Sequence, residues 1–151
     1  MRVLDLVRTS TQTRRERPVE SVVAASGACQ VRAESFTLTT GRRLELHDVT
    51  DEVMARVRGL GVREGVMTLQ SMHTTCCVIV NEGQDALTED ILRYLESSVE
   101  PGVAWRHDDR AYSDCDRQNT DAHLRALLLS PAVTLQVSGG ELVLGQWQRV
   151  I

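Results

Sequence analysis

The amino-acid sequence predicts a single α+β domain. Its 151 residues, 42% of them hydrophobic, are enough for one globular unit with its own core. Strand-like and helix-like segments alternate along the chain, yet two pairs of strand-like segments are joined by tight-turn sequences that are typical of hairpins. Adjacent hairpins favour an α+β arrangement over a purely parallel α/β sheet.

The first half of the domain is predicted to contain a hairpin, a helix and a long apolar segment. The strand-like residues 32–40 and 42–49 flank a Thr-Thr-Gly turn. A helix is predicted over residues 50–61, with Thr50 as its N-cap and two acidic residues in its first turn. Residues 66–80 then form either one long strand or two strands that meet at a kink.

The second half is predicted to contain two further helices and a closing hairpin. Residues 85–99 carry an apolar stripe at helical spacing and are followed by Pro101, which ends a helix. A polar loop over residues 102–119 leads to a short helix over residues 120–129. Strand-like runs on both sides of a Ser-Gly-Gly-Glu turn then form the last hairpin, over residues 132–151.

The N-terminal residues differ from the rest of the chain. Residues 1–30 are polar or small and show no clear periodicity, so we predict an extension with little core of its own, disordered in part. The domain itself is predicted to cover residues 31–151. The adjacent Cys76 and Cys77 make a poor disulfide framework, and reduced thiols are expected. Both lie inside the predicted strand, where packing as a small hydrophobe is favoured over a catalytic cysteine–histidine pair.

Composition argues against nucleic-acid and membrane partners. The chain has a net charge of −4 and only 3% aromatic residues, whereas binding of a phosphate backbone needs a basic face. No apolar run approaches the roughly 20 residues that span a bilayer, and the N-terminus lacks the apolar core of a secretory signal. We therefore expect a cytoplasmic protein. The sequence contains arginine but no lysine, which excludes Schiff-base chemistry on lysine.

Three of the four histidines lie in segments that could form a site. His73 ends a strand-like run, His107 lies in the polar loop within Arg-His-Asp-Asp, and His123 lies in the first turn of the short helix. Any one of them, taken alone, is more often an ordinary surface or core residue, and no zinc-finger spacing links them. The fourth, His47, is excluded because capping and solvation beside Asp48 explain it.

The acidic residues near these histidines have more than one interpretation. Asp108 or Asp109 could orient an imidazole or bind a metal, and a solvated acidic loop explains them equally well. Glu82 could be a general base, a ligand or the first charged residue of a loop. The positive end of a helix favours the neutral imidazole that a metal requires at His123, and the same helix start offers free N–H groups to a phosphate.

Several segments together resemble the YjbQ-like family, whose members are often labelled secondary thiamine-phosphate synthases. The resemblance is carried by His-Thr-Thr-Cys-Cys-Val-Ile-Val-Asn-Glu-Gly at residues 73–83, the acidic helix, the His-Asp-Asp loop, Asn-Thr-Asp-Ala-His at residues 119–123 and the last hairpin. Their order and spacing agree with the family over residues 31–151. Residues 1–30 fall outside it.

The resemblance implies a fold, an assembly and a site. The fold is a two-sheet β-sandwich with flanking helices, and the assembly is a homotrimer. The implied site gathers His73, His107 and His123 around one divalent metal ion, zinc or magnesium, with Glu82 and Asp108 as catalytic carboxylates.

Two departures from the family pattern bear on this expectation. Cys76 and Cys77 stand where small residues are usual, which would narrow the pocket or alter its chemistry. The sequence ends at Ile151, where the family continues into a last strand with an Asp-Gly-Pro-Arg motif. We therefore expect a domain truncated at its C-terminal strand, with weaker anion binding.

The resemblance also implies a function. It is that of a metal-dependent transferase with thiamine-phosphate synthase activity, which joins a pyrimidine methyl diphosphate to a thiazole phosphate and releases diphosphate. A cation held by His and carboxylate groups would neutralise the charge on the departing diphosphate, and the same groups suit metal-assisted hydrolysis equally well. The alternatives are a non-catalytic metal- or anion-binding trimer and a structural trimer with a vestigial pocket. The expected partners are two further copies of the chain and a small phosphorylated substrate.

Overall fold

The computed structural model of the chain describes residues 27–114 and 116–151. The chain divides into two units, Met1–Val31 and Arg32–Ile151, and the second unit contains every described helix and strand. Most of the predicted extension, residues 1–26, lies outside the described residues. Among the described helices, none is long and apolar enough to cross a membrane.

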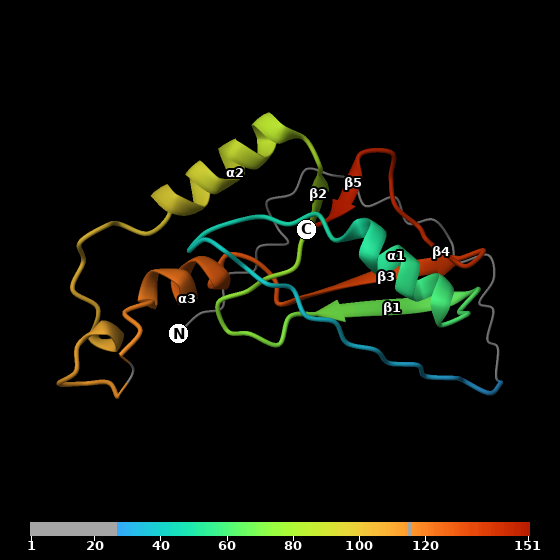
Figure 1. Ribbon diagram of the computed structural model, residues 1–151, viewed down its shortest axis with the longest axis horizontal. Coiled ribbons are helices and arrows are strands. Elements are labelled where there is room, and N and C mark those ends of the chain that lie inside the picture. Colours follow the sequence, from blue (N-terminus) through green and yellow to red (C-terminus); the bar gives the residue numbers. More distant parts are fainter. Residues whose placement is uncertain (1–26, 115) are drawn as a thin grey trace, which may run out of the picture. The chain divides into compact units, whose positions relative to one another are not determined.

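The second unit combines helices with two small antiparallel sheets (Figure 1). The described helices are α1 (Thr50–Gly59), α2 (Asp85–Ser97) and α3 (Thr120–Leu127), with a short 3₁₀ turn, η2 (Arg106–Asp108). The described strands are β1 (Gly65–Gln70), β2 (Val80–Glu82), β3 (Ala132–Ser138), β4 (Glu141–Leu142) and β5 (Gln148–Val150).

Strand pairing confirms the α+β class. The larger sheet has the order β1-β3-β4, and the smaller sheet pairs β2 with β5. In the larger sheet, Gly65 stands opposite Val137. β3 turns into β4 through Gly139 and Gly140, whose φ angles of 63° and 88° suit glycine because it has no Cβ to clash. A sandwich of the two sheets, and a trimer, remain predictions.

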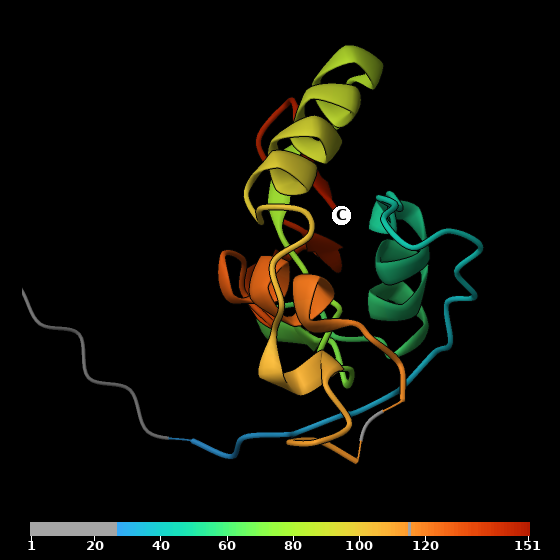
Figure 2. The same cartoon turned by 90° about the vertical axis from the view of Figure 1, so that its left-hand side faces the viewer.

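The main core lies between α1 and the larger sheet. Val53 and Val57, one turn apart on α1, are buried in the same cluster as Val137 of β3 and Leu142 of β4. Figures 1 and 2 both show α1 beside this sheet. They also show the C-terminal end of α2 next to α3, where the Nε–H of Arg125 donates to the Leu95 carbonyl at 2.8 Å.

Hydrogen bonds tie β5 and the residue after it to the start of α1 and to the residue before β2. The N–H of Val150, a fully buried residue, donates to the Thr50 hydroxyl at 2.8 Å, and the Val150 carbonyl accepts the N–H of Val49 at 2.9 Å. Ile79 and Ile151 exchange two further bonds, of 2.8 and 2.9 Å. The last residues of the chain therefore fix the beginning of α1 and the beginning of β2 at once.

The hairpin predicted over residues 32–49 is wrong, because this segment contains no strand. Side chains hold it instead. Glu34 pairs with Arg56 of α1, and Arg43 pairs with Asp121 of α3 at 2.6 Å. These contacts with the helices take the place of a cross-strand ladder, so strand propensity does not decide the local structure.

The long apolar segment forms two strands, but a loop of residues 71–79 replaces the expected kink. Local bonds explain this loop. The Ser71 hydroxyl accepts the N–H of His73 at 3.2 Å, and the His73 carbonyl accepts the N–H of Cys76 at 3.1 Å. Such bonds offer the backbone an alternative to the sheet. The expectation that Cys76 and Cys77 lie inside a strand is therefore wrong.

The helices follow the predictions closely, whereas the last hairpin does so only in part. The prediction of Thr50 as the N-cap of α1 is wrong by one residue, because Val49 occupies that position and Thr50 is the first helical residue. The Asp48 carboxylate accepts the N–H of Thr50 at 2.9 Å. α2 begins with Gln84, whose side chain accepts the N–H of Leu87 at 2.7 Å. β3 and β4 form the predicted hairpin, but β5 leaves it to pair with β2.

Thr50→Val is expected to lower the free energy of unfolding by about 1–3 kcal/mol, because it preserves shape but leaves the buried N–H of Val150 without its acceptor. Thr50→Ser is the matched control, since it keeps the hydroxyl. Urea unfolding followed by circular dichroism measures both variants. A loss in Thr50→Ser with no loss in Thr50→Val would show that methyl packing, rather than the hydrogen bond, stabilises this junction.

Candidate functional site

The short elements η2 and α3 bring most of the candidate residues together. Oδ1 of Asp108 accepts both the N–H of Thr120, at 3.1 Å, and its hydroxyl, at 2.8 Å. Thr120 is buried and is the first residue of α3. A single carboxylate oxygen therefore joins η2 to the start of α3. This contact fixes the site residues on η2 relative to those on α3.

Two of the three predicted metal ligands are neighbours. The rings of His107 and His123 have their centroids 5.1 Å apart and meet edge to face, at 86°. The Nε2 atom of His107 is buried and has no hydrogen-bond partner in the described part of the chain. A buried polar atom without a partner costs free energy, so this nitrogen favours a bound ion or substrate. Two imidazoles on one tetrahedral ion, with bonds of about 2.0–2.1 Å, would show a similar ring spacing.

His73, the third predicted ligand, is not grouped with this pair. It lies exposed in the loop of residues 71–79, where Nδ1 contacts the Thr75 hydroxyl at 2.9 Å. Across residues 27–114 and 116–151, no three His, Cys, Asp or Glu side chains lie together as ligands of one ion. A single chain thus brings His107 and His123 together without His73.

No described hydrogen bond or ion pair joins the histidine pair to Glu82, His47 or the two cysteines. Glu82 ends β2 and is exposed, and none of its described hydrogen bonds or ion pairs reaches the histidine pair. His47 lies 3.0 Å from Glu45 instead. The Cys77 thiol donates to the Ala126 carbonyl of α3 at 3.3 Å, and burial raises its pKa, which keeps it protonated and a poor nucleophile. Cys76 and Cys77 are free thiols.

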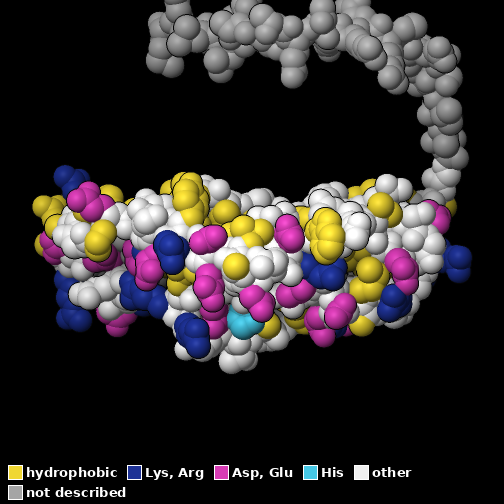
Figure 3. Space-filling view, turned by 90° about the horizontal axis from the view of Figure 1, so that it is seen from above, with side chains coloured by type: hydrophobic (Ala, Val, Ile, Leu, Met, Phe, Trp, Pro, Cys, Tyr) yellow, Lys and Arg dark blue, Asp and Glu magenta, His cyan; other side chains and the backbone are white. Residues whose placement is uncertain are grey.

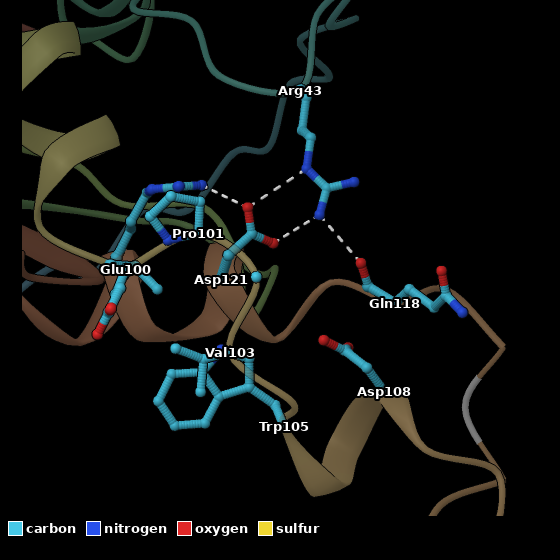
Figure 4. A pocket seen from close by; sticks show the side chains of 11 residues that line it. Arg43, Glu100, Pro101, Val103, Trp105, Asp108, Gln118 and Asp121 are labelled. Atoms are coloured by element: carbon cyan, nitrogen blue, oxygen red, sulfur yellow. Dashed lines mark hydrogen bonds and ion pairs between the residues drawn. The ribbon is translucent and has the colours of Figure 1, made fainter.

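A cavity of about 320 Å³ lies beside the junction of η2 and α3 (Figure 4). One part of its wall is apolar and is formed by Val99, Pro101, Val103 and Trp105. The polar part is formed by Arg43, Glu100, Asp108, Gln118, Asp121 and Arg125. Sequence reasoning singled out Asp108 alone among these residues. Asp108 therefore belongs both to the cavity and to the bonds that hold α3.

Two arginines converge on Asp121 at the polar wall. Arg43 donates to Oδ1 and Arg125 donates to Oδ2, each at 2.6 Å. The hydrogen bond from Arg43, together with that from Arg125, lowers the pKa of Asp121 to about 2. The pair of Asp121 and Arg125 shows the i,i+4 spacing of a helix ion pair and could have been found in the sequence. The contact of Arg43 with Asp121 joins residues too far apart for any local signal.

Comparisons with known proteins agree with this fold. A family model described as UPF0047 protein YjbQ-like matches residues 34–151. A UPF0047 protein of Archaeoglobus fulgidus is 41% identical over 116 residues, which cover 77% of this chain and 85% of that protein. The UPF0047 protein YugU of Bacillus subtilis is 30% identical over 119 residues, or 78% of this chain and 84% of YugU.

Solved structures show the same likeness. A hypothetical protein of Aeropyrum pernix K1 matches with a TM-score of 0.68 and 35% identity, covering 76% of this chain and 81% of its own. A protein of unknown function from Sulfolobus solfataricus P2 matches with a TM-score of 0.67 and 33% identity, covering 75% and 78%. The likeness in sequence and fold therefore extends over most of each chain.

The ion pairs of Asp121 predict a pH-dependent stability. A carboxyl whose pKa falls on folding contributes stability above its unfolded pKa, here 3.8, and loses it as the pH falls toward about 2. Asp121→Asn cannot titrate. The difference in unfolding free energy between the unaltered chain and this variant should stay constant above pH about 5 and shrink below about 4. Urea unfolding across this range measures it, and a difference that persists at the acid limit would contradict the assignment.

Proposed function

The chain belongs to the YjbQ-like UPF0047 family, and from this membership and its histidine pair we propose that it is a metal-dependent enzyme acting on a small phosphorylated substrate. The observation that carries the proposal is the buried Nε2 of His107, which has no partner among the described residues and lies beside a second imidazole. Such a nitrogen is either a cost to stability or part of a site that is completed by a ligand.

His107 and His123 fit two positions of a divalent metal site. The donors are imidazoles, which suit zinc, and neighbouring carboxylates would suit magnesium as well. When bound, the ion would supply positive charge opposite a departing phosphate group. His73 is the proposed third ligand, delivered by a movement of residues 71–79 or by a neighbouring copy of the chain.

The proposed reaction is thiamine-phosphate synthesis, as the family resemblance implies. The bond between the pyrimidine methylene carbon and the diphosphate oxygen breaks, a bond from that carbon to the thiazole nitrogen forms, and diphosphate leaves. Asp108, held in place by Thr120, would orient groups bound at the histidine pair. The bond from the thiazole nitrogen forms without removal of a proton, so the general base proposed at Glu82, at the end of β2, would act in the alternative metal-assisted hydrolysis, taking a proton from the attacking water once assembly brings it to the site.

A homotrimer is part of the same proposal. Among the described strands, β1 has a partner on one side only, and Val66 on it is 72% exposed. An open strand edge with exposed apolar side chains favours burial against another chain. Further large hydrophobic side chains are exposed at Met72, Leu127, Leu128 and Trp147. On the face seen in Figure 3, hydrophobic side chains lie among interspersed acidic and basic ones, which suits a mixed protein interface better than a nucleic acid.

Light scattering of the full chain at micromolar concentration is expected to give three times the 16.8 kDa mass of one chain. Val66→Glu should shift the species toward the monomer, because it places a charge on the open edge of β1. The matched control is Val31→Glu, at an exposed position that belongs to the other unit of the chain. A monomer in the unaltered protein would refute the assembly.

Zinc binding and turnover test the site directly. His107→Ala and His123→Ala should each weaken zinc binding at least about tenfold, because each removes one ligand, whereas His47→Ala should leave it unchanged. Calorimetric titration of the metal-free protein measures binding, and far-UV circular dichroism checks the fold. Turnover of a pyrimidine diphosphate with a thiazole phosphate, with and without chelator, is then compared for Glu82→Gln and Asp108→Asn.

The outcomes separate the candidate functions. Loss of turnover in folded Glu82→Gln and Asp108→Asn supports the enzyme. Zinc binding that depends on the histidine pair, with no turnover in the unaltered protein, indicates a metal-binding protein without catalysis. Equal zinc binding in all three histidine variants would refute the metal site and the enzyme with it.

A further inference from the structure

We propose that the cavity beside η2 and α3 is a binding site for a small planar organic cation that carries N–H donors, such as an amidinium or a protonated amino-substituted nitrogen heterocycle. The lining of this cavity includes neither His107 nor His123. The inference therefore goes beyond the proposed metal site and does not require a metal.

The size and apolar wall of the cavity suit a single ring. Its volume of about 320 Å³ is at the lower end of the range for small-molecule pockets. Figure 4 shows Trp105 and Val103 together on one side of the space, with Asp108, Asp121 and Gln118 across from them. An apolar wall that contains an indole ring can hold a flat ligand by packing, while polar oxygens across from it hydrogen-bond the polar edge of the ligand.

The two arginines of the cavity are already engaged, which argues against an anionic ligand. Arg43 donates to Asp121 and also to the Gln118 carbonyl, at 3.0 Å. Arg125 donates to Asp121 and to the Leu95 carbonyl, at 2.8 Å. Each arginine keeps one terminal nitrogen without a described partner, but its charge is already paired with Asp121, which weakens its attraction for an anion. The arginines serve mainly to hold the polar wall together.

Asp108 is the acceptor that remains for a ligand. Its Oδ1 is fixed by Thr120, and in the described part of the chain its Oδ2 has no hydrogen-bond partner. The side chain is half-buried, so this oxygen is held in a defined position rather than moving freely in water. A pre-positioned carboxylate binds a flat N–H donor of opposite charge better than a mobile one does.

The net charge of the cavity lining also favours a cationic ligand. Its two arginines, Arg43 and Arg125, face three carboxylates, those of Glu100, Asp108 and Asp121, which leaves one net negative charge. A cation on Oδ2 of Asp108 would neutralise this charge and could place its ring over Trp105, where a cation–π contact adds attraction. A phosphate or carboxylate in the same place would meet Asp108 as a like charge.

Three ligands of nearly equal size and shape test the charge preference. Benzamidine is cationic, benzamide is neutral and benzoate is anionic. They are titrated against the full chain carrying Trp147→Phe, so that indole fluorescence reports Trp105 alone. Benzamidine should quench this fluorescence with a Kd on the order of a millimolar, at least about tenfold tighter than benzamide, and benzoate should bind more weakly still.

Paired substitutions then test the named residues. Asp108→Asn keeps an oxygen for Thr120 but removes the charge, and should weaken benzamidine binding at least about tenfold. Asp109→Asn, the neighbouring carboxylate outside the cavity lining, should not. Trp105→Leu should also weaken binding, whereas Trp147→Leu should not, both being followed by ligand-observed NMR. If Trp105→Leu fails to fold, the three ligands and the Asp108 and Asp109 variants still decide the proposal.

Several outcomes would overturn this proposal. Tighter binding of benzoate would show that the arginines accept an anion, and equal binding of all three ligands would reveal an unselective apolar hollow. Absence of benzamidine binding, or an equal effect of Asp109→Asn, would exclude the site. Benzamidine binding should be the same with and without chelator, so failure of the metal site and failure of this cavity are told apart.

Discussion

The fold depends on the backbone bonds of Val150, which join segments from both ends of the domain. Its N–H is buried against the Thr50 hydroxyl, and its carbonyl accepts the N–H of Val49. Because Thr50 begins α1, the same contact sets where α1 lies over the larger sheet. The neighbouring bonds between Ile79 and Ile151 set where the loop of residues 71–79 ends. The end of this loop therefore depends on Ile151, far away in the sequence.

Asp108 has a comparable role on the other side of the domain. One of its oxygens holds the start of α3, and the other has no hydrogen-bond partner among the described residues. Stability and ligand binding therefore share one side chain, but they need different properties of it. An acceptor oxygen is sufficient for the bonds to Thr120, whereas a negative charge is needed to attract a cation. This difference explains how a capping contact can also be part of a binding site.

The helices could be predicted from the sequence because their signals are local. The acidic first turn of α1, the apolar stripe of α2 and Pro101 after it all act within a few residues. The loop of residues 71–79 could not, because the bonds of Ser71 and His73 compete with a sheet that strand propensity alone favours. The proximity of His107 and His123 followed from the family resemblance rather than from spacing. The contact of Arg43 with Asp121 was beyond local reasoning, since it depends on how the complete chain packs.

Helix α3 contributes residues both to the histidine pair and to the cavity, on different sides of the helix. Asp121 and Arg125 are one turn apart and share the face that lines the cavity, whereas His123 is about 200° around the helix from Asp121. The imidazole pair and the cavity thus occupy different sides of α3. η2 is adjacent to both, because it carries His107 toward His123 and Asp108 into the cavity lining. A ligand with a cationic ring and an anionic arm could therefore engage both sides by passing the start of α3, where Asp108 is fixed.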